Sequence, residues 1–297
     1  MKYPKYKIKI NIIILIAFFV GCGMAQAISI TPSVIEFRAK PGEMKEFKIK
    51  LKNNEKSDIC FKLDVEAIKK MNSDGSPVFD TITASRMIAP WFSIKENNIC
   101  AKSGETINFT LAIKIPDNAK PAGYYAAAYF SSLPNAAETG SAVVNRIGIL
   151  VAIRVDGTII QEQAKISQFI FDGINKKFII DFTNDGTVHL RPYGEIIIKT
   201  NTGKAIDNLP FNEAGVLVLP ASTRHFEILW DNRLYESAVA TIEILYGTGP
   251  KKALAAIALE AQAPKTETNN RLMVFISLIA GAIILGYIIK KIRRNNY

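Results

Sequence analysis

The sequence predicts an all-β protein: two tandem immunoglobulin-like β-sandwich domains, followed by a single transmembrane α-helix. Three observations carry this prediction. Nearly every apolar segment between residues 28 and 262 is short, rich in β-branched residues and bounded by turn residues. About seven such segments fall in each domain-sized stretch, with no convincing pattern for a soluble helix. One long, uncharged apolar run stands near the C-terminus.

Residues 1–27 have the composition of a secretory signal peptide. Four lysines in the first nine residues precede the apolar core INIIILIAFFV at 10–20, and AQA at 25–27 supplies the small residues that signal peptidase requires. We therefore expect the mature chain to begin at Ile28. Cys22, within FFVGC, offers a competing lipoprotein cleavage site, which a phenylalanine three residues earlier fits poorly. Lipidation of Cys22 stays an open alternative.

The C-terminal end predicts a membrane anchor. Residues 272–289, LMVFISLIAGAIILGYII, carry no charge, and 18 residues at about 1.5 Å each span roughly 27 Å, enough to cross the hydrocarbon core. The tail at 290–297 contains four basic residues, which stay on the cytoplasmic side. We expect a single-pass cell membrane protein with its N-terminal ectodomain outside, in the periplasm or at the cell surface. A polar linker at 263–271 joins the ectodomain to the anchor.

The net charge of +10 follows from this topology. Residues 28–263 contain 27 Lys and Arg against 26 Asp and Glu, a net charge of +1, so the excess lies in the signal, the tail and their margins. A basic balance placed at the two ends indicates membrane topology, and we expect no nucleic-acid partner.

The ectodomain divides into two sandwiches, at 28–156 and 157–262, with the boundary near Asp156–Gly157. The first domain is predicted to have strands near 33–37, 46–51, 59–67, 91–94, 106–115, 123–131 and 146–155. The second is predicted to have strands near 159–171, 178–183, 188–199, 216–219, 223–229, 238–246 and 253–260. Phe47, Ile49 and Leu51 alternate with charged residues, the period-2 pattern of a half-buried strand.

Two cysteines remain in the mature region, Cys60 and Cys100. Export makes a disulfide between them permissible, and it would close a loop of about 40 residues, contributing roughly 4 kcal/mol in the chain-entropy model. The alternative is a pair of buried free thiols. We favour the disulfide.

The sequence offers no constellation for catalysis. His189 and His225 each stand alone, without a cysteine or histidine at metal-ligand spacing, and are expected at the surface or at strand ends. Neither a phosphate-binding Gly-Lys-Ser/Thr loop nor a Gly-x-Ser-x-Gly motif appears. We expect a protein that is not an enzyme, with no cofactor, no metal and no small-molecule substrate. The residues of its binding surface stay unidentified.

Three segments raise the question of binding. NRIGILVAIRV at 145–155 is apolar on both faces, which favours a buried central strand; the alternative is an edge strand that pairs with a partner. PVFDTITASRMIAPWF at 77–92 is a long connection, either a covering loop or a partner surface, with Trp91 expected in the core. Tyr124 opens a strand after the turn DNAKPAG, where a sandwich places a corner tyrosine, so Tyr125 should face the opposite side.

Two stretches carry a family resemblance. SITPSVIEFRAKPGEMKEFKIKLKNNEKSDICFKLDVEA at 29–67 resembles the opening of a bacterial envelope Ig-like domain, and WFSIKENNICAKSGETINFTLAIKIPDNAKPAGYYAAAYF at 91–130 resembles its continuation. With the signal, two sandwiches, span and basic tail, the layout is similar to the WxL-interacting proteins of bacterial cell surfaces. That resemblance implies a first domain associated with peptidoglycan and a second that binds protein partners. The cysteine pair departs from the family's usual pattern.

A weaker resemblance is to the soluble periplasmic pilus chaperones of the PapD type, which also have two Ig-like domains and complete a subunit with an alternating apolar strand, as IGILVAI at 147–153 could. The leading hypothesis is a non-enzymatic, membrane-anchored envelope protein that binds surface proteins or cell wall through its Ig-like domains. The alternative is a tethered assembly factor or chaperone for pili or surface fibres. Neither the ligand nor the envelope type follows from the sequence.

Overall fold

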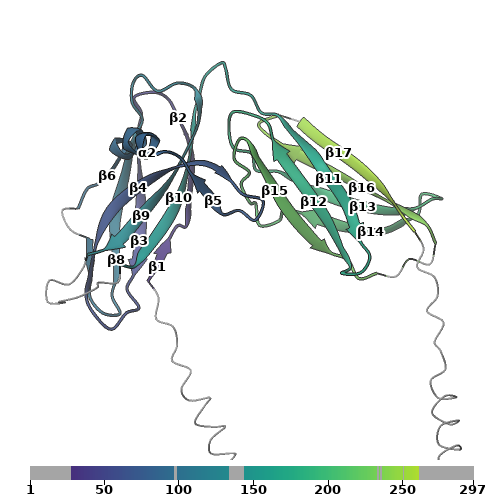
Figure 1. Ribbon diagram of the computed structural model, residues 1–297, viewed down its shortest axis with the longest axis horizontal. Helices are drawn as coiled ribbons and strands as arrows, with labels where there is room; N and C mark the ends of the chain where they lie inside the picture. The colour runs from purple at the N-terminus through teal and green to yellow at the C-terminus, as the bar shows by residue number, and fades with distance from the viewer. Residues whose placement is uncertain are drawn as a thin grey trace, which may run out of the picture.

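The computed structural model describes residues 28–260, apart from 97, 98, 134–143, 233, 235 and 250. The predicted signal, linker, membrane span and tail lie outside these residues. The described residues form two β-sandwiches set at an angle to one another (Figure 1). Within this part of the chain, no helix is long and apolar enough to cross a bilayer. The predicted all-β, immunoglobulin-like class is confirmed.

Two sheets form the first domain. One has the strand order β1-β3-β8-β6 and the other β2-β10-β9-β4-β5, with β7 also paired to β4. The strands are β1 (Ser29–Thr31), β2 (Val34–Ala39), β3 (Met44–Lys52), β4 (Ile59–Met71), β5 (Pro77–Phe79), β6 (Phe92–Ile94), β7 (Ile99–Ala101), β8 (Thr106–Lys114), β9 (Ala122–Ser132) and β10 (Arg146–Val155).

The core of the first domain lies between these sheets. Ile49 and Leu51 of β3 are fully buried while the intervening Lys50 is exposed, as the period-2 pattern predicts. Across the core, the rings of Phe109 on β8 and Phe130 on β9 lie 5.1 Å apart. Burial of alternate side chains therefore fixes the register of the central strands, because a slip by one residue would expose the apolar set.

The two tyrosines that open β9 face opposite sides of the sheet, as predicted. The Tyr124 hydroxyl donates a hydrogen bond to the Lys120 carbonyl at 3.0 Å, and its ring lies 4.8 Å from that of Trp91, which packs against the core. Tyr125 is buried on the other face of the sheet, toward the second domain. Tyr124 is thus a corner tyrosine of the scaffold.

The second domain also has two sheets, with strand orders β11-β12-β15 and β14-β13-β16-β17. Phe178, Ile180 and Phe182 alternate along β12 and are fully buried against the other sheet. The strands are β11 (Ala164–Asp172), β12 (Lys177–Asn184), β13 (Tyr193–Thr200), β14 (Ala205–Phe211), β15 (Ser222–Leu229), β16 (Ala238–Tyr246) and β17 (Lys251–Leu259).

The connection at 77–92 differs from the predicted loop. It contains β5, the helix α2 (Ile82–Ile88) and the 3₁₀ turn η1 (Ala89–Trp91). Thr81 starts α2, because its side chain accepts a hydrogen bond from the Ala84 N–H at 3.1 Å. The expectation of no soluble helix was therefore wrong at this point: seven residues are too few for a helical period to be visible in the sequence.

The second domain corrects three strand predictions. Residues 216–219 form no strand of their own; Val218 makes one isolated bridge with Leu190. The strand that the sequence did not predict is β14. It contains Asn208 and Pro210, and both residue types are rare in strands. The strands predicted to start at 159 and 188 begin at Ala164 and Tyr193, since the residues before them form the junction between the domains.

Candidate functional site

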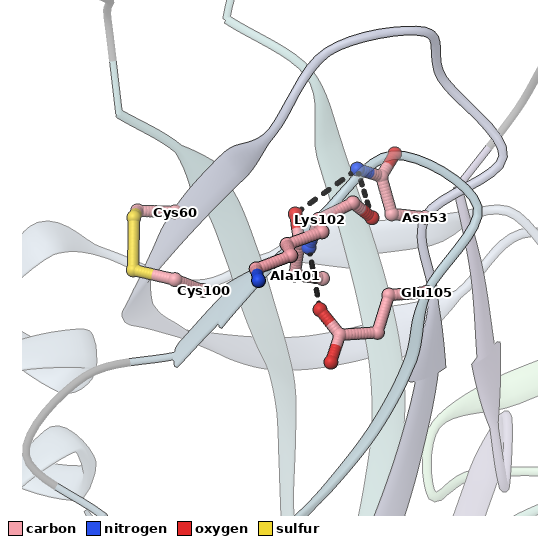
Figure 2. Close-up of a disulfide and its surroundings, with 6 residues drawn as sticks. All are labelled: Asn53, Cys60, Cys100, Ala101, Lys102 and Glu105. Atoms are coloured by element: carbon pink, nitrogen blue, oxygen red, sulfur yellow. Dashed lines mark hydrogen bonds between the residues drawn. A yellow bond between two sulfur atoms is a disulfide. The ribbon is translucent and has the colours of Figure 1, made fainter.

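The disulfide joins two neighbouring strands of the first domain. Cys60 on β4 and Cys100 on β7 stand directly opposite one another, with their Cα atoms 4.0 Å apart (Figure 2). Beside them Asn53 is fully buried, and its amide nitrogen donates to the carbonyls of Ala101 and Lys102 at 3.1 Å. The Cys60 carbonyl accepts a hydrogen bond from the Leu133 N–H at 2.8 Å. This cluster is structural: it fixes the short strand β7 to the sheet.

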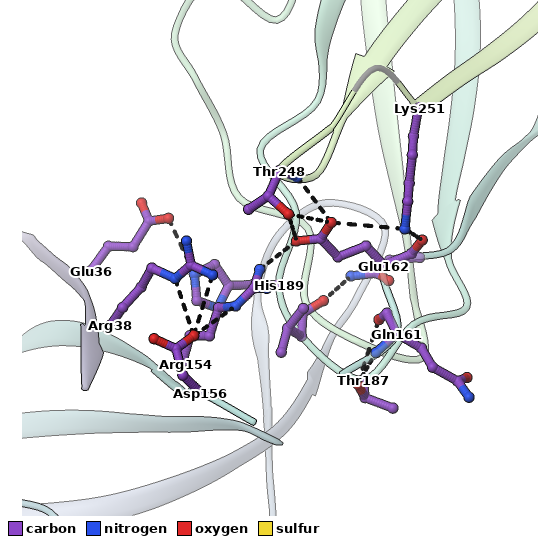
Figure 3. Close-up of polar contacts among 12 residues, drawn as sticks. Glu36, Arg38, Arg154, Asp156, Gln161, Glu162, Thr187, His189, Thr248 and Lys251 are labelled. Carbon is purple, nitrogen blue, oxygen red and sulfur yellow. Dashed lines mark hydrogen bonds and ion pairs between the residues drawn. The ribbon is translucent and has the colours of Figure 1, made fainter. Parts of the chain in front are cut away.

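A polar cluster spans the two domains at the opposite end of the sheet (Figure 3). His189, from the loop before β13, is buried; its Nε2 lies 3.1 Å from Glu36 Oε1 on β2, and its Nδ1 lies 3.3 Å from the Tyr125 hydroxyl. Arg191 also donates to Glu36. The hydrogen bond with His189, followed by that with Arg191, outweighs partial burial and lowers the pKa of Glu36 to about 2. Burial raises the pKa of Tyr125 above its ordinary value.

A second ion pair lies beside the first, between Arg154 at the end of β10 and Glu162 in the connection between the domains. The Glu162 side chain is 5% exposed, and Arg154, the N–H of Thr248 and the Thr248 hydroxyl all donate to its carboxylate. Burial opposes ionisation, but these donors outweigh it and lower the pKa of Glu162 to about 2. Lys251 Nζ donates to the Glu162 carbonyl at 2.7 Å.

Both ion pairs, Glu36–Arg191 and Arg154–Glu162, line a cleft of about 290 Å³ between the domains, together with Arg38 and His189. The charges are matched within the cleft: Arg38 pairs with Asp156, Arg154 with Glu162, and Arg191 with Glu36. Each cation thus has a protein carboxylate as its partner. The arrangement therefore acts first as a clamp that sets the angle between the domains.

Apolar contacts reinforce the same junction. Leu219 of the second domain is fully buried against Tyr125, Ala127 and Ala152 on the outer face of the first domain's large sheet. The small alanines of β9 let this layer approach closely. A buried apolar seam of this kind makes independent rotation of the domains unfavourable.

The hairpin β4–β5 makes a third contact between the domains, reaching across to β15 in Figure 1. The His225 N–H donates to the Ser73 carbonyl at 3.0 Å, and the Met71 N–H donates to the Ser222 hydroxyl at 2.9 Å. The turn of the hairpin is so close that a Cβ on Gly75 would lie 1.7 Å from Arg224 Nη1. The hairpin covers the outer edge of β15 and ties the sandwiches together.

Strand β10 has one edge that is only partly covered. On one side β9 pairs with its whole length, Arg146–Val155, while on the other side β2 pairs in parallel only from Leu150 onward. Of the described strands, none pairs with the outer edge of residues 146–149. The segment predicted as either a central or an edge strand is therefore both. Residues 150–155 are central, and residues 146–149 form an edge.

The hydrogen-bonding direction of this open edge follows from strand alternation. The Leu150 N–H donates to the Ser33 carbonyl on the β2 side at 3.0 Å, whereas the Asn145 carbonyl accepts from the Ser132 N–H on the β9 side at 2.8 Å. Because successive residues point their backbone groups to opposite edges, the N–H and C=O of Arg146 and Gly148 face the open edge. Two residues thus offer four backbone groups to an added strand.

Side chains beside the open edge shape its two faces. On the inner face Ile147 is half-buried and packs against the core, and Ile149 is fully buried. On the outer face the Tyr129 ring lies over Gly148, where an added Cβ would be 2.8 Å from the ring. The Arg146 guanidinium sits 4.1 Å from the centre of that ring and donates to Glu66 at 2.7 Å. An added strand would meet an apolar inner face and an aromatic, charged outer face.

One of the two histidines is placed differently from expectation. His189 is buried at the domain junction and not at the surface, because Tyr125 and Glu36 from the other domain cover it. His225 lies in β15, partly exposed, with Nδ1 2.7 Å from Asp181 Oδ1. Within the described residues no group of three or more potential ligands could hold a metal ion. Lone histidines carry no sequence signal for an interdomain contact, so this role could not be predicted.

The chain resembles several solved structures at low sequence identity. No family model and no curated protein matches the chain. The class 5 fimbriae chaperone CfaA is 10% identical with a TM-score of 0.40, covering 80% of this chain and 100% of its own. The CsuC–CsuE chaperone–tip adhesion subunit complex of Acinetobacter baumannii is 14% identical with a TM-score of 0.37, covering 80% of this chain and 100% of its own. The Salmonella enterica SafA pilin–SafB chaperone complex is 11% identical with a TM-score of 0.37, covering 80% of this chain and 99% of its own.

The structural neighbours are thus PapD-like pilus chaperones, the class named by the weaker sequence resemblance, and the resemblance to WxL-interacting proteins finds no support. At such low identities and TM-scores, these likenesses decide nothing about the partner of this chain.

Proposed function

We propose that this protein is a non-enzymatic, membrane-anchored assembly factor of the cell envelope. It holds an extended segment of a surface-protein subunit by β-strand addition at the open edge of β10. The observation that carries this proposal is the incomplete pairing of β10, whose residues 146–149 have β9 on one side and no described strand on the other. An edge of this kind is a template for strand addition.

The apolar inner face supports strand addition over simple adhesion. A segment paired with Arg146 and Gly148 would place alternate side chains next to Ile147, at the margin of the first domain's core. Four backbone hydrogen bonds contribute about 2–6 kcal/mol in total, at about 0.5–1.5 kcal/mol each. That is too little for a stable complex, so apolar residues of the partner must supply the remainder by entering this margin.

The anchoring part of the proposal rests on sequence. The uncharged run at 272–289, followed by four basic residues, supports a chain held in the membrane with both sandwiches outside. A tether keeps the open edge close to the site where surface subunits emerge. The tether and the open edge together favour an assembly role over the broader hypothesis of a receptor for cell wall. No observation in the described residues supports cell-wall binding.

A test of this edge has to leave the core of the first domain intact. A charge at Ile149 or Val151 cannot separate binding from folding, because both side chains are fully buried in the core. A photo-crosslinking residue at Val144, which is 48% exposed just before β10, probes the open edge from outside. The matched control is Met44 on β3 of the other sheet, 54% exposed.

The full chain carrying either probe is irradiated in its native envelope. The proposal expects an adduct from position 144 that contains a β-rich surface subunit, and no such adduct from position 44. Peptidoglycan in the adduct would favour the cell-wall hypothesis instead. Equal adducts from both positions, or none from position 144, would contradict strand addition at this edge.

A further inference from the structure

The far end of the second domain carries a second surface that the proposed function does not use. We call this end the distal pole; it is formed by the turn 173–176, the end of β15 at Leu229, the turn 201–204 and the end of β17 at Leu259. We propose that the distal pole lies on the lipid surface, with Ile174 and Leu229 inserted among the headgroups. This inference rests on the membrane anchoring proposed above.

Strand register brings these segments together. Lys177, which follows the turn 173–176, pairs with Leu229, and the Trp230 N–H donates to the Lys176 carbonyl at 2.8 Å. The second sheet joins them because Trp230 Nε1 donates to Asp207 Oδ2 on β14 at 2.9 Å. The opposite end of the domain holds Glu162 and Lys251, next to the first domain.

The distal pole exposes the most accessible large apolar side chains of the described residues. Ile174 is 92% exposed and Leu229 is 78% exposed, and Ile170 lies on the same sheet at 42%. The turn that presents Ile174 is well built, since the Asp172 carboxylate accepts hydrogen bonds from the N–H groups of Ile174 and Asn175 at 3.0 Å. A rigid turn that holds an isoleucine out into water indicates a contact surface.

The route of the chain identifies the occupant. β17 runs away from the first domain, because Tyr246 pairs with Lys251 at its start and Ala238 with Leu259 at its end. Twelve residues, 260–271, separate Leu259 from the apolar run at 272–289. As a flexible coil they span roughly 20 Å, and fully extended roughly 40 Å. The distal pole is therefore the part of the ectodomain that the anchor holds nearest to the bilayer.

The charges at the distal pole indicate an apolar contact and not an electrostatic one. Lys199 and Lys204 are exposed there, but so are Asp231 and Glu236 in the connection after β15. The balance gives no strong attraction to anionic lipid. Interfacial residues of this kind bury about 5–10 Å into the boundary between headgroups and acyl chains. Binding of the pole should accordingly change little with salt.

The test uses the full chain in nanodiscs of phosphatidylethanolamine and phosphatidylglycerol. An environment-sensitive fluorophore is attached through I174C, or through I82C as the control, since Ile82 is an isoleucine of the first domain that is 73% exposed. Cys22 is replaced by serine in both variants, and Cys60 and Cys100 are already joined. Both labelled chains are then measured with and without shallow doxyl-labelled lipid.

We expect the emission of the fluorophore on I174C to shift to the blue and to be quenched by doxyl lipid, and both effects to be unchanged by salt. The fluorophore on I82C should show neither effect. Equal signals from the two labels would overturn the inference. A blue shift without lipid quenching would place a protein, such as a second copy of this chain, on the distal pole and would also overturn it. A chain that fails to co-elute with the nanodiscs would contradict the anchoring itself, and this distinguishes the two failures.

Discussion

His189 Nε2 lies 3.1 Å from Glu36 Oε1. A loop of the second sandwich is therefore hydrogen-bonded to strand β2, in the large sheet of the first sandwich. The same sheet presents the open edge of β10 at its other end. The position of the second domain is therefore fixed relative to the edge at which a partner is proposed to bind. Substitutions at single residues of the junction should therefore change the free energy of unfolding.

The Glu36 carboxylate should make the stability of the junction depend on pH. Its pKa is lowered from 4.5 to about 2 in the folded protein, so its stabilising contribution is fully present above pH 4.5 and is lost as the pH falls toward 2. Because the side chain is about a third exposed, we expect a loss of only ~1–2 kcal/mol. Urea unfolding of the wild type and of E36Q at several pH values checks this. A similar acid sensitivity in E36Q would assign the effect to other groups.

The Arg154–Glu162 pair should show the cost of an unpaired buried charge. E162A leaves the guanidinium without its main partner, and we expect a loss of about 3–5 kcal/mol in the free energy of unfolding. The double variant R154M/E162L removes both charges and should recover most of that loss. Denaturant titration of the three chains measures the difference. A double variant as unstable as E162A would mean that packing and not charge dominates here.

Two glycines with nearly the same backbone conformation separate the hairpin contact from backbone strain. Gly75 has φ +89° and lies against Arg224, whereas Gly203 has φ +88° and open space, with no atom within 4 Å of where a Cβ would lie. Both G75A and G203A carry the strain of a positive φ, about 1–3 kcal/mol. Only G75A should also displace the hairpin from β15, which limited proteolysis and small-angle scattering would detect as looser domains. Equal behaviour would contradict a role for the hairpin in fixing the angle.

The disulfide should stabilise the first domain through the unfolded chain. Cys60 and Cys100 are 40 residues apart, and closing a loop of that length contributes roughly 4 kcal/mol in the chain-entropy model. The double variant C60S/C100S should therefore unfold at lower denaturant concentration, matching the wild type under reducing conditions. Unchanged stability would show that Asn53 and the neighbouring strands hold β7 unaided.

The sequence predicted well what local patterns determine. Alternation in β3 placed Ile49 and Leu51 in the core, and the turn before Tyr124 placed its hydroxyl on the backbone. The prediction from sequence failed where the local pattern is short or interrupted. The helix α2 has only seven residues, and the strand β14 contains Pro210. These elements are specified by tertiary packing, which a local pattern does not contain.

The candidate site could be predicted only in part. The apolar segment at 145–155 drew attention as either a central or an edge strand, but its division at Leu150 depends on where β2 begins. The junction cluster gave no sequence signal, since Glu36, Arg154 and His189 are far apart in the chain and match no motif. Such contacts arise from how the domains pack, so a single sequence cannot show them.

Backbone groups on the open edge of β10 are proposed to bind the partner. Arg146 allows a direct test, because its N–H faces that edge and its position at the start of the strand tolerates proline. R146A and R146P both remove the side-chain contacts with Glu66 and Tyr129, and only R146P also removes the N–H.

The deciding measurement is the affinity of R146A and R146P for the subunit captured at position 144, with the melting temperatures of both chains compared. We expect equal melting temperatures and an affinity about tenfold weaker for R146P than for R146A, the effect of one lost hydrogen bond. Equal affinities in two equally stable chains would contradict strand addition at this edge.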